Sequence, residues 1–192
     1  MGARNDTRRE MIRAGARLFA ANGYEATSLL DVVNAAGASR GSIYFHFPEG
    51  KDQLAREALV YSGDRVLQRA AEAIQHGTDT AEAIRRTADV LATGLEESDF
   101  AMGCPVATVA LETANTDEAL REVSADFFSN WQSLYVGSLL RDGFDPARAR
   151  RLATLIVSVI EGGLLLARTT GSAEPLRSAC DEAALLLEST KR

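Results

Sequence analysis

Hydrophobic residues recur at intervals of three and four along most of the chain, which is the spacing of an amphipathic α-helix. In the opening stretch this pattern predicts a helix over residues 6–21, ending at Asn22-Gly23 because glycine accepts the left-handed backbone of a helix terminus. A second, short helix starts at the N-cap Ser28, and a third runs from the N-cap Ser39 to about His46. Three helices are therefore expected within the first fifty residues.

The rest of the chain continues with the helical period, and no segment alternates hydrophobic and polar residues as a strand would. A long helix is expected from residue 51 to about Gly77, and a domain boundary is expected at the start of this helix. The later helices are predicted to begin at Asp79 or Thr80, at Pro105, at Thr116, at Asp145-Pro146 and after Pro175. The fold class is all-α, with an N-terminal domain of residues 1–50 and a helical domain of residues 51–192.

Composition restricts the class of protein further. The chain has 192 residues, of which 46% are hydrophobic and 25% charged, so it can bury a core without disulfides. Its unbroken apolar runs are far shorter than the roughly 20 residues that cross a bilayer, and no signal sequence is apparent. We therefore expect a cytoplasmic protein with no membrane partner. Cys104 and Cys180 stand apart and predict free thiols, with neither a metal site nor a cofactor.

The charge is distributed unevenly along the chain. The net charge is −6, but residues 1–55 hold seven Lys and Arg against six Asp and Glu, a net of +1. The remainder holds fourteen against twenty-one, a net of −7. The N-terminal region is therefore a local basic patch on an acidic molecule, and its first helix carries Arg4, Arg8, Arg9, Arg13 and Arg17.

The segment from residue 27 to residue 47 has the pattern of a helix-turn-helix. Its apolar residues are expected to pack inward, and Gly37 allows a sharp turn between the two helices. The third helix then presents Arg40, Gly41, Ser42, Tyr44 and His46 outward, a set of small residues and donors that fits a major groove about 12 Å wide. Ser39 could meet a phosphate at the helix start, and Lys51 could reach the DNA backbone from the side.

A family resemblance rests on residues at fixed spacing from Arg9 to Leu54. These are Ala16, Leu18-Phe19, Gly23-Tyr24, Thr27-Ser28, Asp31-Val32, Ala36-Gly37, Ser39, Gly41, Ile43-Tyr44, His46-Phe47 and Lys51. The run resembles the DNA-binding domain of the TetR family of regulators. The resemblance implies an all-α homodimer that releases DNA on binding a small molecule, with Tyr44 and Lys51 on phosphates. The candidate DNA contacts are Thr27, Ser28, Ser39, Arg40, Gly41, Ser42, Tyr44, His46 and Lys51.

One departure points to a branch of that family. Members usually read Phe-x-x-Lys after the recognition helix, whereas one extra residue separates Phe47 from Lys51 here. This is similar to the LmrA/YxaF-like branch, as are Gly103 to Ala107, Leu111-Glu112, Phe128 to Trp131 and Glu161 to Gly163. The second resemblance covers roughly residues 80–190 and implies a domain for effector binding and dimerisation, with helices 146–169 and 175–189 at the dimer interface.

The effector site is expected among apolar walls between helices, and the effector to be apolar or aromatic. Its candidates are Phe100, Met102, Cys104, Phe127, Phe128, Trp131, Tyr135, Ile160 and Leu164. Aromatic residues at helical spacing are equally compatible with an ordinary core. Cys104 also allows a redox interpretation, and Glu112 and Glu161 allow either ligand binding or a solvated or capping role.

Other functional classes find less support in the sequence. No GxSxG, P-loop, HExxH or GxGxxG motif is present, and two histidines offer little acid-base capacity, so no enzyme is expected. The alternative that stays open is a helical protein-interaction module that never touches DNA. The favoured interpretation is a homodimeric repressor on a pseudo-palindromic operator, because two heads related by a two-fold axis need half-sites about 34–36 Å apart or a multiple of this.

Overall fold

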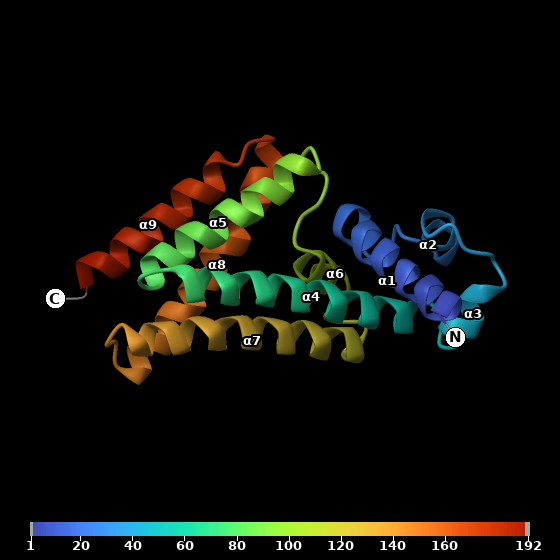
Figure 1. Ribbon diagram of the computed structural model, residues 1–192, viewed down its shortest axis with the longest axis horizontal. Helices are drawn as coiled ribbons and strands as arrows, with labels where there is room; N and C mark the ends of the chain where they lie inside the picture. The colour runs from blue at the N-terminus through green and yellow to red at the C-terminus, as the bar shows by residue number, and fades with distance from the viewer. Residues whose placement is uncertain (1, 191–192) are drawn as a thin grey trace. The chain divides into compact units, whose positions relative to one another are not determined.

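The computed structural model describes residues 2–190, and this part of the chain contains nine α-helices and no strand (Figure 1). The all-α prediction is confirmed. The helices are α1 (Gly2–Asn22), α2 (Leu29–Ala35), α3 (Ser42–His46), α4 (Lys51–His76), α5 (Thr80–Glu97), α6 (Pro105–Thr113), α7 (Glu118–Arg141), α8 (Pro146–Thr170) and α9 (Glu174–Thr190).

The chain divides into two compact units, which are described separately. The first unit comprises Met1–Asp64 and Cys104–Phe127, and the second comprises Arg65–Gly103 and Phe128–Arg192. The first unit extends beyond the predicted limit near residue 50, because Leu54 on α4 belongs to its core and α6 packs against α1. The three N-terminal helices therefore share one unit with the first half of α4 and with α6.

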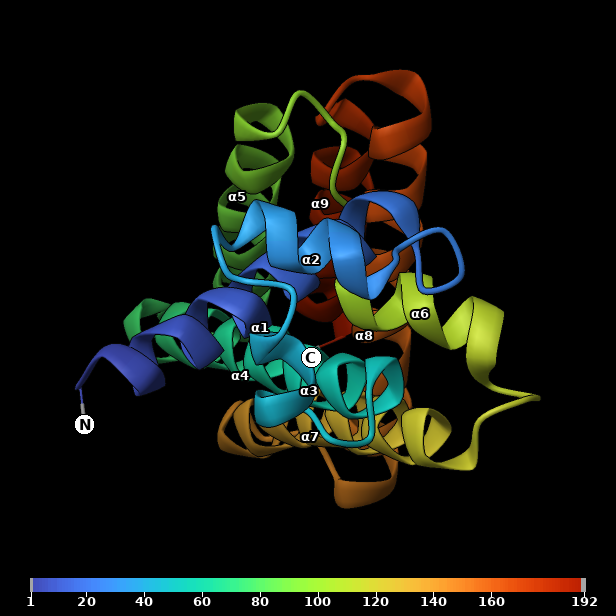
Figure 2. The same cartoon turned by 90° about the vertical axis from the view of Figure 1, so that its right-hand side faces the viewer.

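The core of the first unit joins the three N-terminal helices to α4 (Figure 2). Its buried residues are Met11, Ala14, Val32, Val33, Ile43, Phe47 and Leu54. Arg8 covers this core from α1, since its guanidinium carbon lies 5.1 Å from the centroid of the Phe47 ring. The same guanidinium pairs with Glu57 on α4, with an N–O distance of 2.5 Å. The ion pair and the ring contact thus hold α1 against α4.

The start of α2 is a capping box, as the sequence predicts. The Ser28 hydroxyl accepts the N–H of Asp31, and the Asp31 carboxylate accepts the N–H of Ser28 at 2.9 Å. The Ser28 hydroxyl also donates to that carboxylate, and these bonds lower the pKa of Asp31. Gly37 then turns the chain with a φ of +63°.

The start of α3 differs from the prediction. The helix begins at Ser42 with Gly41 as its N-cap, and no side chain caps it. Ser39 instead lies in the preceding turn, where its carbonyl oxygen accepts the N–H of Ser42 at 3.0 Å and the hydroxyl of Ser42 at 2.6 Å. The prediction of Ser39 as an N-cap was wrong, because this turn uses the backbone of Ser39 and not its side chain.

The additional residue between Phe47 and Lys51 is taken up by a tight turn. Gly50 has a φ of +73°, and its N–H donates to the carbonyl oxygen of Phe47 at 2.9 Å. The carbonyl oxygen of Gly50 then accepts the N–H of Leu54. The turn therefore leads directly into α4 at Lys51.

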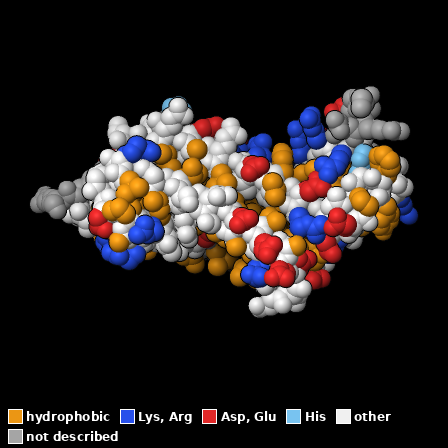
Figure 3. Space-filling model, turned by 90° about the horizontal axis from the view of Figure 1, so that it is seen from below, with side chains coloured by type: hydrophobic (Ala, Val, Ile, Leu, Met, Phe, Trp, Pro, Cys, Tyr) orange, Lys and Arg blue, Asp and Glu red, His pale blue; other side chains and the backbone are white. Residues whose placement is uncertain are grey.

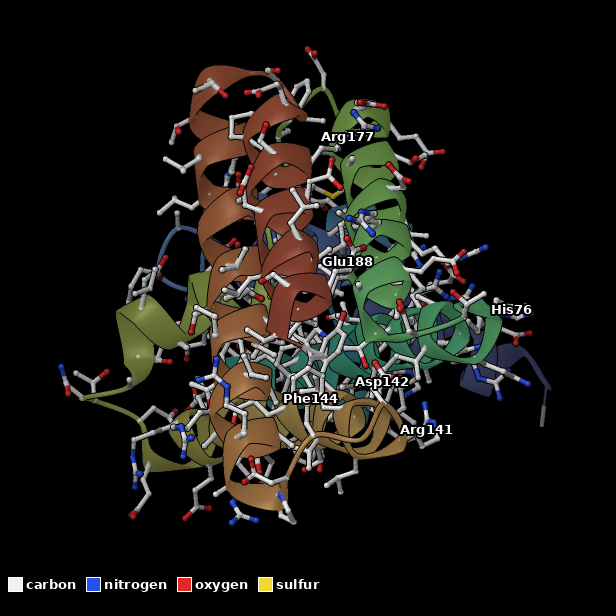
Figure 4. All side chains as sticks on the ribbon, turned by 90° about the vertical axis from the view of Figure 1, so that its left-hand side faces the viewer. His76, Arg141, Asp142, Phe144, Arg177 and Glu188 are labelled. Atoms are coloured by element: carbon white, nitrogen blue, oxygen red, sulfur yellow. The ribbon has the colours of Figure 1, made fainter. Side chains whose placement is uncertain are left out.

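The second unit is built around α5, α8 and α9, which pack side by side (Figures 1 and 4). Arg85 on α5 pairs with Asp181 and Glu188 on α9, each at 2.7 Å. Arg177 on α9 pairs in return with two carboxylates of α5, those of Asp89 and Glu96. Figure 4 shows Arg177 and Glu188 at two levels of α9 beside α5.

Most of the predicted helix starts in the remaining chain are confirmed. Asp79 caps α5, Pro105 is the first residue of α6, and Asp145 caps α8 ahead of Pro146. α7 is an exception, because the carboxylate of Asp117, and not Thr116, accepts the N–H of Leu120 at 2.9 Å. The start of α9 also differs slightly: the helix begins at Glu174, whereas the sequence predicted a start after Pro175.

Among the described residues, α8 is the one helix with the length and mean hydropathy to span a membrane. In the structure it packs against α9 and α5, and its apolar face supplies core residues of the second unit. The apolar character of α8 is thus used in helix packing within this unit.

The close approach of α8 and α9 depends on Gly163. A Cβ atom at this position would lie 2.9 Å from the Leu176 side chain and 3.0 Å from the Leu176 Cα atom. Because backbone atoms cannot give way as a flexible side chain can, α8 and α9 would have to separate. Gly162, the next residue back along α8, is exposed and has open space at the corresponding point.

We predict that Gly163→Ala lowers the free energy of unfolding by about 1–3 kcal/mol through overpacking. The matched variant is Gly94→Ala on α5, where a Cβ atom would meet nothing within 4 Å. This variant should raise the free energy of unfolding by about 0.5–1 kcal/mol, because alanine favours the helix over glycine. Urea unfolding followed by circular dichroism measures both, and equal stabilisation by the two variants would contradict the proposed packing.

Candidate nucleic-acid interface

The turn between α2 and α3, together with α3 itself, forms an exposed surface on the first unit. Ser28, Ser39, Arg40, Gly41 and Tyr44 are all exposed, with the Tyr44 side chain at 64%. Their orientation follows from the burial of the apolar residues of α2 and α3, since residues on opposite sides of a short helix cannot both face the core. Ser42, His46 and Lys51 are half-buried.

Thr27 does not share the surface. Its side chain is 1% exposed, and its hydroxyl donates to the carbonyl oxygen of Gly23 at 2.8 Å. Its N–H donates to the carbonyl oxygen of Tyr24. The placement of Thr27 among DNA-contacting side chains is therefore corrected: its hydroxyl closes the turn between α1 and α2.

Phe45 belongs to the exposed surface but was not among the candidates from the sequence. It is 68% exposed, more than Tyr44, and its ring meets the His46 ring edge-on at 5.1 Å. The signal was present, because in a helix that buries Ile43 and Phe47, positions 44 and 45 lie on the side turned away from the core. At the right-hand end of Figure 3, hydrophobic side chains, a histidine and Lys or Arg side chains lie close together.

Lys51 is held in place at the start of α4. Its ammonium lies 4.1 Å from the centroid of the Tyr24 ring and donates to the carbonyl oxygen of Glu25 at 3.5 Å. The Tyr24 hydroxyl donates in turn to the carboxylate of Asp52. Burial, together with this hydrogen bond, raises the pKa of Tyr24, so the ring stays neutral beneath the ammonium. Sequence reasoning missed this role of Tyr24.

Some arginines of the first unit form ion pairs with carboxylates, which offset their positive charge. Arg13 pairs with Glu10 at 2.7 Å, and Arg56 pairs with Glu49 at 2.5 Å. Arg9 and Arg17 are exposed on α1, and Arg40 is exposed on the turn before α3. Arg4 lies in a segment whose side chains are outside the described part of the structure.

The candidate effector residues fall into both units. Cys104 and Phe127 belong to the first unit and the other seven to the second. In the first unit, the Cys104 sulfur accepts the N–H of Ala107 at 3.5 Å as the N-cap of α6, and the Phe127 ring lies against Gly63 on α4. In the second unit Phe100, Met102 and Phe128 are half-buried, and Trp131, Tyr135, Ile160 and Leu164 are buried.

A chain of polar groups runs through the core of the second unit. The Tyr135 hydroxyl donates to Thr87 Oγ1 at 3.1 Å, and the Thr87 hydroxyl donates to the carbonyl oxygen of Ala83 at 2.9 Å. Burial raises the pKa of Tyr135. The Tyr135 hydroxyl therefore has a defined partner in the core of the second unit.

Two further titratable residues, Cys180 and Glu112, are held in the structure by burial or by a hydrogen bond. Burial raises the pKa of Cys180 to about 12, so this thiol is protonated at neutral pH and unreactive. Glu112 accepts the N–H of Glu25 at 2.8 Å. Within residues 2–190, no group of three His, Cys, Asp or Glu side chains is arranged to hold a metal ion.

A short exposed helix that follows a glycine turn and is seated on a three-helix core is the architecture of a helix-turn-helix DNA-binding unit. The model for bacterial regulatory proteins of the tetR family matches residues 11–58. The model for the C-terminal domain of LmrA/YxaF-like transcriptional regulators matches residues 80–182. The chain belongs to the TetR family of transcriptional regulators, in its LmrA/YxaF-like group.

Individual relatives agree with this assignment. The chain is 36% identical over 176 residues to the HTH-type transcriptional regulator YxaF of Bacillus subtilis, covering 92% of each chain. It is 35% identical over 171 residues to LmrA of the same organism, covering 89% of this chain and 91% of LmrA. A TetR regulator from Chloroflexus aurantiacus has 31% identity and a TM-score of 0.81, over 98% of this chain and 97% of that one.

A further solved structure shows the same fold at lower identity. It is a cysteine mutant of the TetR family regulator CifR in complex with double-stranded operator DNA. Its chain is 21% identical, with a TM-score of 0.79 over 91% of this chain and 94% of that one.

Proposed function

We propose that this protein is a homodimeric, sequence-specific repressor that binds operator DNA through residues 1–50 and an effector through residues 51–192. The observation that carries the proposal is the exposed face of α3 and its preceding turn, with Lys51 held at the start of α4 by Tyr24 and Glu25. As a TetR-family regulator the protein acts in the cytoplasm, where DNA is accessible.

The roles of the surface residues follow from their chemistry. Arg40 carries the planar donor pair that recognises the O6 and N7 acceptors of guanine in the major groove. The Tyr44 hydroxyl and the Lys51 ammonium contact phosphates, and these contacts fix the register of the helix without reading sequence. Further contacts are expected at the edge of this surface. Gly41 allows a close approach to the DNA, and hydrogen bonds can come from the side chains of Ser28, Ser39, Ser42 and His46.

We predict that Tyr44→Ala and Lys51→Ala weaken binding to all duplexes, and that Lys51→Ala reduces the slope of log K against log salt by about 1. Arg40→Ala should instead reduce the preference for the selected site by about 1–3 kcal/mol. The measurement is fluorescence anisotropy with a duplex selected from a randomised pool and with a mixed-sequence duplex, over a range of salt concentrations.

The charge-matched control is Arg150→Ala, which removes one positive charge from an exposed position on α8. It should change the affinity for either duplex much less than Lys51→Ala does. The competing hypothesis, a protein-interaction module, requires that the unaltered protein bind no duplex at any salt concentration. Full activity of all three surface variants would refute the assignment of the reading face.

For the dimer, the proposal uses exposed leucines on the last two helices. Leu155, Leu165 and Leu166 on α8 and Leu185 and Leu186 on α9 are 40–60% exposed. These helices pack against each other within one chain, so one apolar surface can pair with its copy about a two-fold axis. Such a pair presents two reading heads, and the operator is then a pseudo-palindrome.

We predict that Leu165→Glu shifts the protein from dimer to monomer in sedimentation equilibrium, because it places a charge inside an apolar interface. The matched variant is Leu111→Glu on α6, a leucine that is 87% exposed and belongs to the first unit. It should leave the dimer intact. Dissociation by both variants, or by neither, would place the interface elsewhere.

For the effector, the proposal is an apolar or aromatic compound held within the second unit. Its binding favours a spacing of the two heads that does not fit the groove, so effector and DNA weaken each other by the same free energy, typically about 1–3 kcal/mol. The support is the set of large buried and half-buried side chains of the second unit, which includes Trp131 and Tyr135 on α7.

We predict that an aromatic compound that binds there alters the fluorescence of Trp131, the single tryptophan of the chain and a fully buried one. A panel of planar aromatic compounds is titrated against the protein, and each compound that gives a signal is titrated again with DNA present. Its affinity should fall about 5–150-fold in the presence of DNA. Identical affinities with and without DNA would refute the inducer mechanism.

A further inference from the structure

The turn between α1 and α2 is held from outside by α6, all within the first unit. The carboxylate of Glu112, one residue before the end of α6, accepts the backbone N–H of Glu25 at 2.8 Å. Gly23 has a φ of +84°, and a methyl group there would collide with this carboxylate. The Glu112 side chain therefore lies directly against the backbone of the turn.

The same turn holds Lys51. The carbonyl oxygen of Glu25 accepts a hydrogen bond from the Lys51 ammonium, which also lies over the ring of the neighbouring Tyr24. Glu25 is thus hydrogen-bonded through its N–H to α6 and through its C=O to the first residue of α4. A displacement of Glu112 would release the turn on one side and loosen the support of Lys51 on the other.

We propose that Glu112 is a positioning residue for DNA binding: it fixes the turn at Glu25 and thereby the phosphate contact of Lys51 and the start of α2. The proposal rests on the proposed DNA-binding function. It assigns a role to Glu112, the acidic residue of the Leu111-Glu112 motif, which the DNA contacts themselves leave unexplained.

Electrostatics alone predicts the opposite effect of Glu112 on DNA affinity. A carboxylate near a DNA-contacting lysine repels phosphates, so removal of its charge should strengthen binding to any duplex. A positioning role predicts that loss of the acceptor oxygen weakens binding. The sign of the change in DNA affinity on removal of Glu112 therefore distinguishes electrostatic repulsion from a positioning role. Glu112→Gln provides a second test, because it removes the charge but its amide oxygen can still accept the N–H of Glu25.

The first experiment measures affinity for a mixed-sequence duplex over a range of salt concentrations with the full-length chain. Glu112→Ala should bind about fivefold more weakly, as expected for the loss of one hydrogen bond. Its salt slope should be smaller by up to about 1, because the Lys51 contact is loosened. Glu112→Gln and the charge-matched control Glu122→Ala, at an exposed position of α7, should bind at least as tightly as the unaltered protein.

The second experiment measures amide hydrogen exchange at Glu25 in the free protein. Exchange should be faster in Glu112→Ala and unchanged in Leu111→Ala, its neighbour on α6. Because the Glu112 hydrogen bond is solvent-exposed, the thermal unfolding midpoint should barely move, so a change in DNA affinity reports positioning and not folding.

Two results would overturn the proposal: Glu112→Ala binding as tightly as Glu122→Ala, or unchanged exchange at Glu25. A protein that binds no duplex even at low salt would refute the DNA-binding function itself and the role of Glu112 with it. That outcome is distinguishable, because the exchange experiment contains no DNA and shows independently whether α6 holds the turn.

Discussion

A helix of five residues such as α3 is unstable in water by itself, because nucleation fixes several backbone dihedrals in return for few hydrogen bonds. Ile43 and Phe47 supply the missing stability by entering the core of the first unit, where full burial of a large apolar side chain contributes about 1.5–3 kcal/mol. The direction in which Tyr44 and Phe45 point is a consequence of that burial. The orientation of the reading surface therefore depends on the core of the first unit.

The two units are stabilised in different ways. In the first unit, polar side chains hold helix starts and neighbouring helices: Ser28 caps α2, and the Arg8–Glu57 ion pair joins α1 to α4. In the second unit, long helices approach closely through small residues such as Gly163, and buried hydroxyls form hydrogen bonds from Tyr135 to Thr87 and from Thr87 to Ala83.

Much of the fold was predictable because helix periodicity and capping are local properties. Ser28 was recognised as a cap, and helix starts were correctly expected at Asp79 or Thr80 and at Asp145-Pro146, since a short polar side chain ahead of an apolar helical pattern is typical of an N-cap. Ser39 and Thr116 were misassigned because several serines, threonines and aspartates stood close together, and only the backbone path decides which one caps. Thr27 was misplaced because a buried hydroxyl that bonds its own turn looks the same in sequence as an exposed one.

The contacts of the candidate site that join distant segments were not predictable from one sequence. Tyr24 beneath Lys51 and Glu112 on Glu25 link residues 27 and 87 positions apart, and neither link leaves a periodic trace. Family resemblance identified the exposed surface but not its support. The extent of the first unit was missed for the same reason, because the packing of α6 against α1 involves residues far apart in the chain.

The ion pairs between α5 and α9 have one further consequence. Arg85, Asp89 and Glu96 on α5 have the same spacing as Arg177, Asp181 and Glu188 on α9, and each arginine meets the two carboxylates of the other helix. The antiparallel pair therefore has local two-fold pseudosymmetry. Each exposed ion pair contributes little free energy alone. Sliding one helix along the other by a turn, however, would break all four ion pairs at once. This arrangement acts as a register lock, which selects one alignment of two leucine- and alanine-rich helices that could otherwise slip.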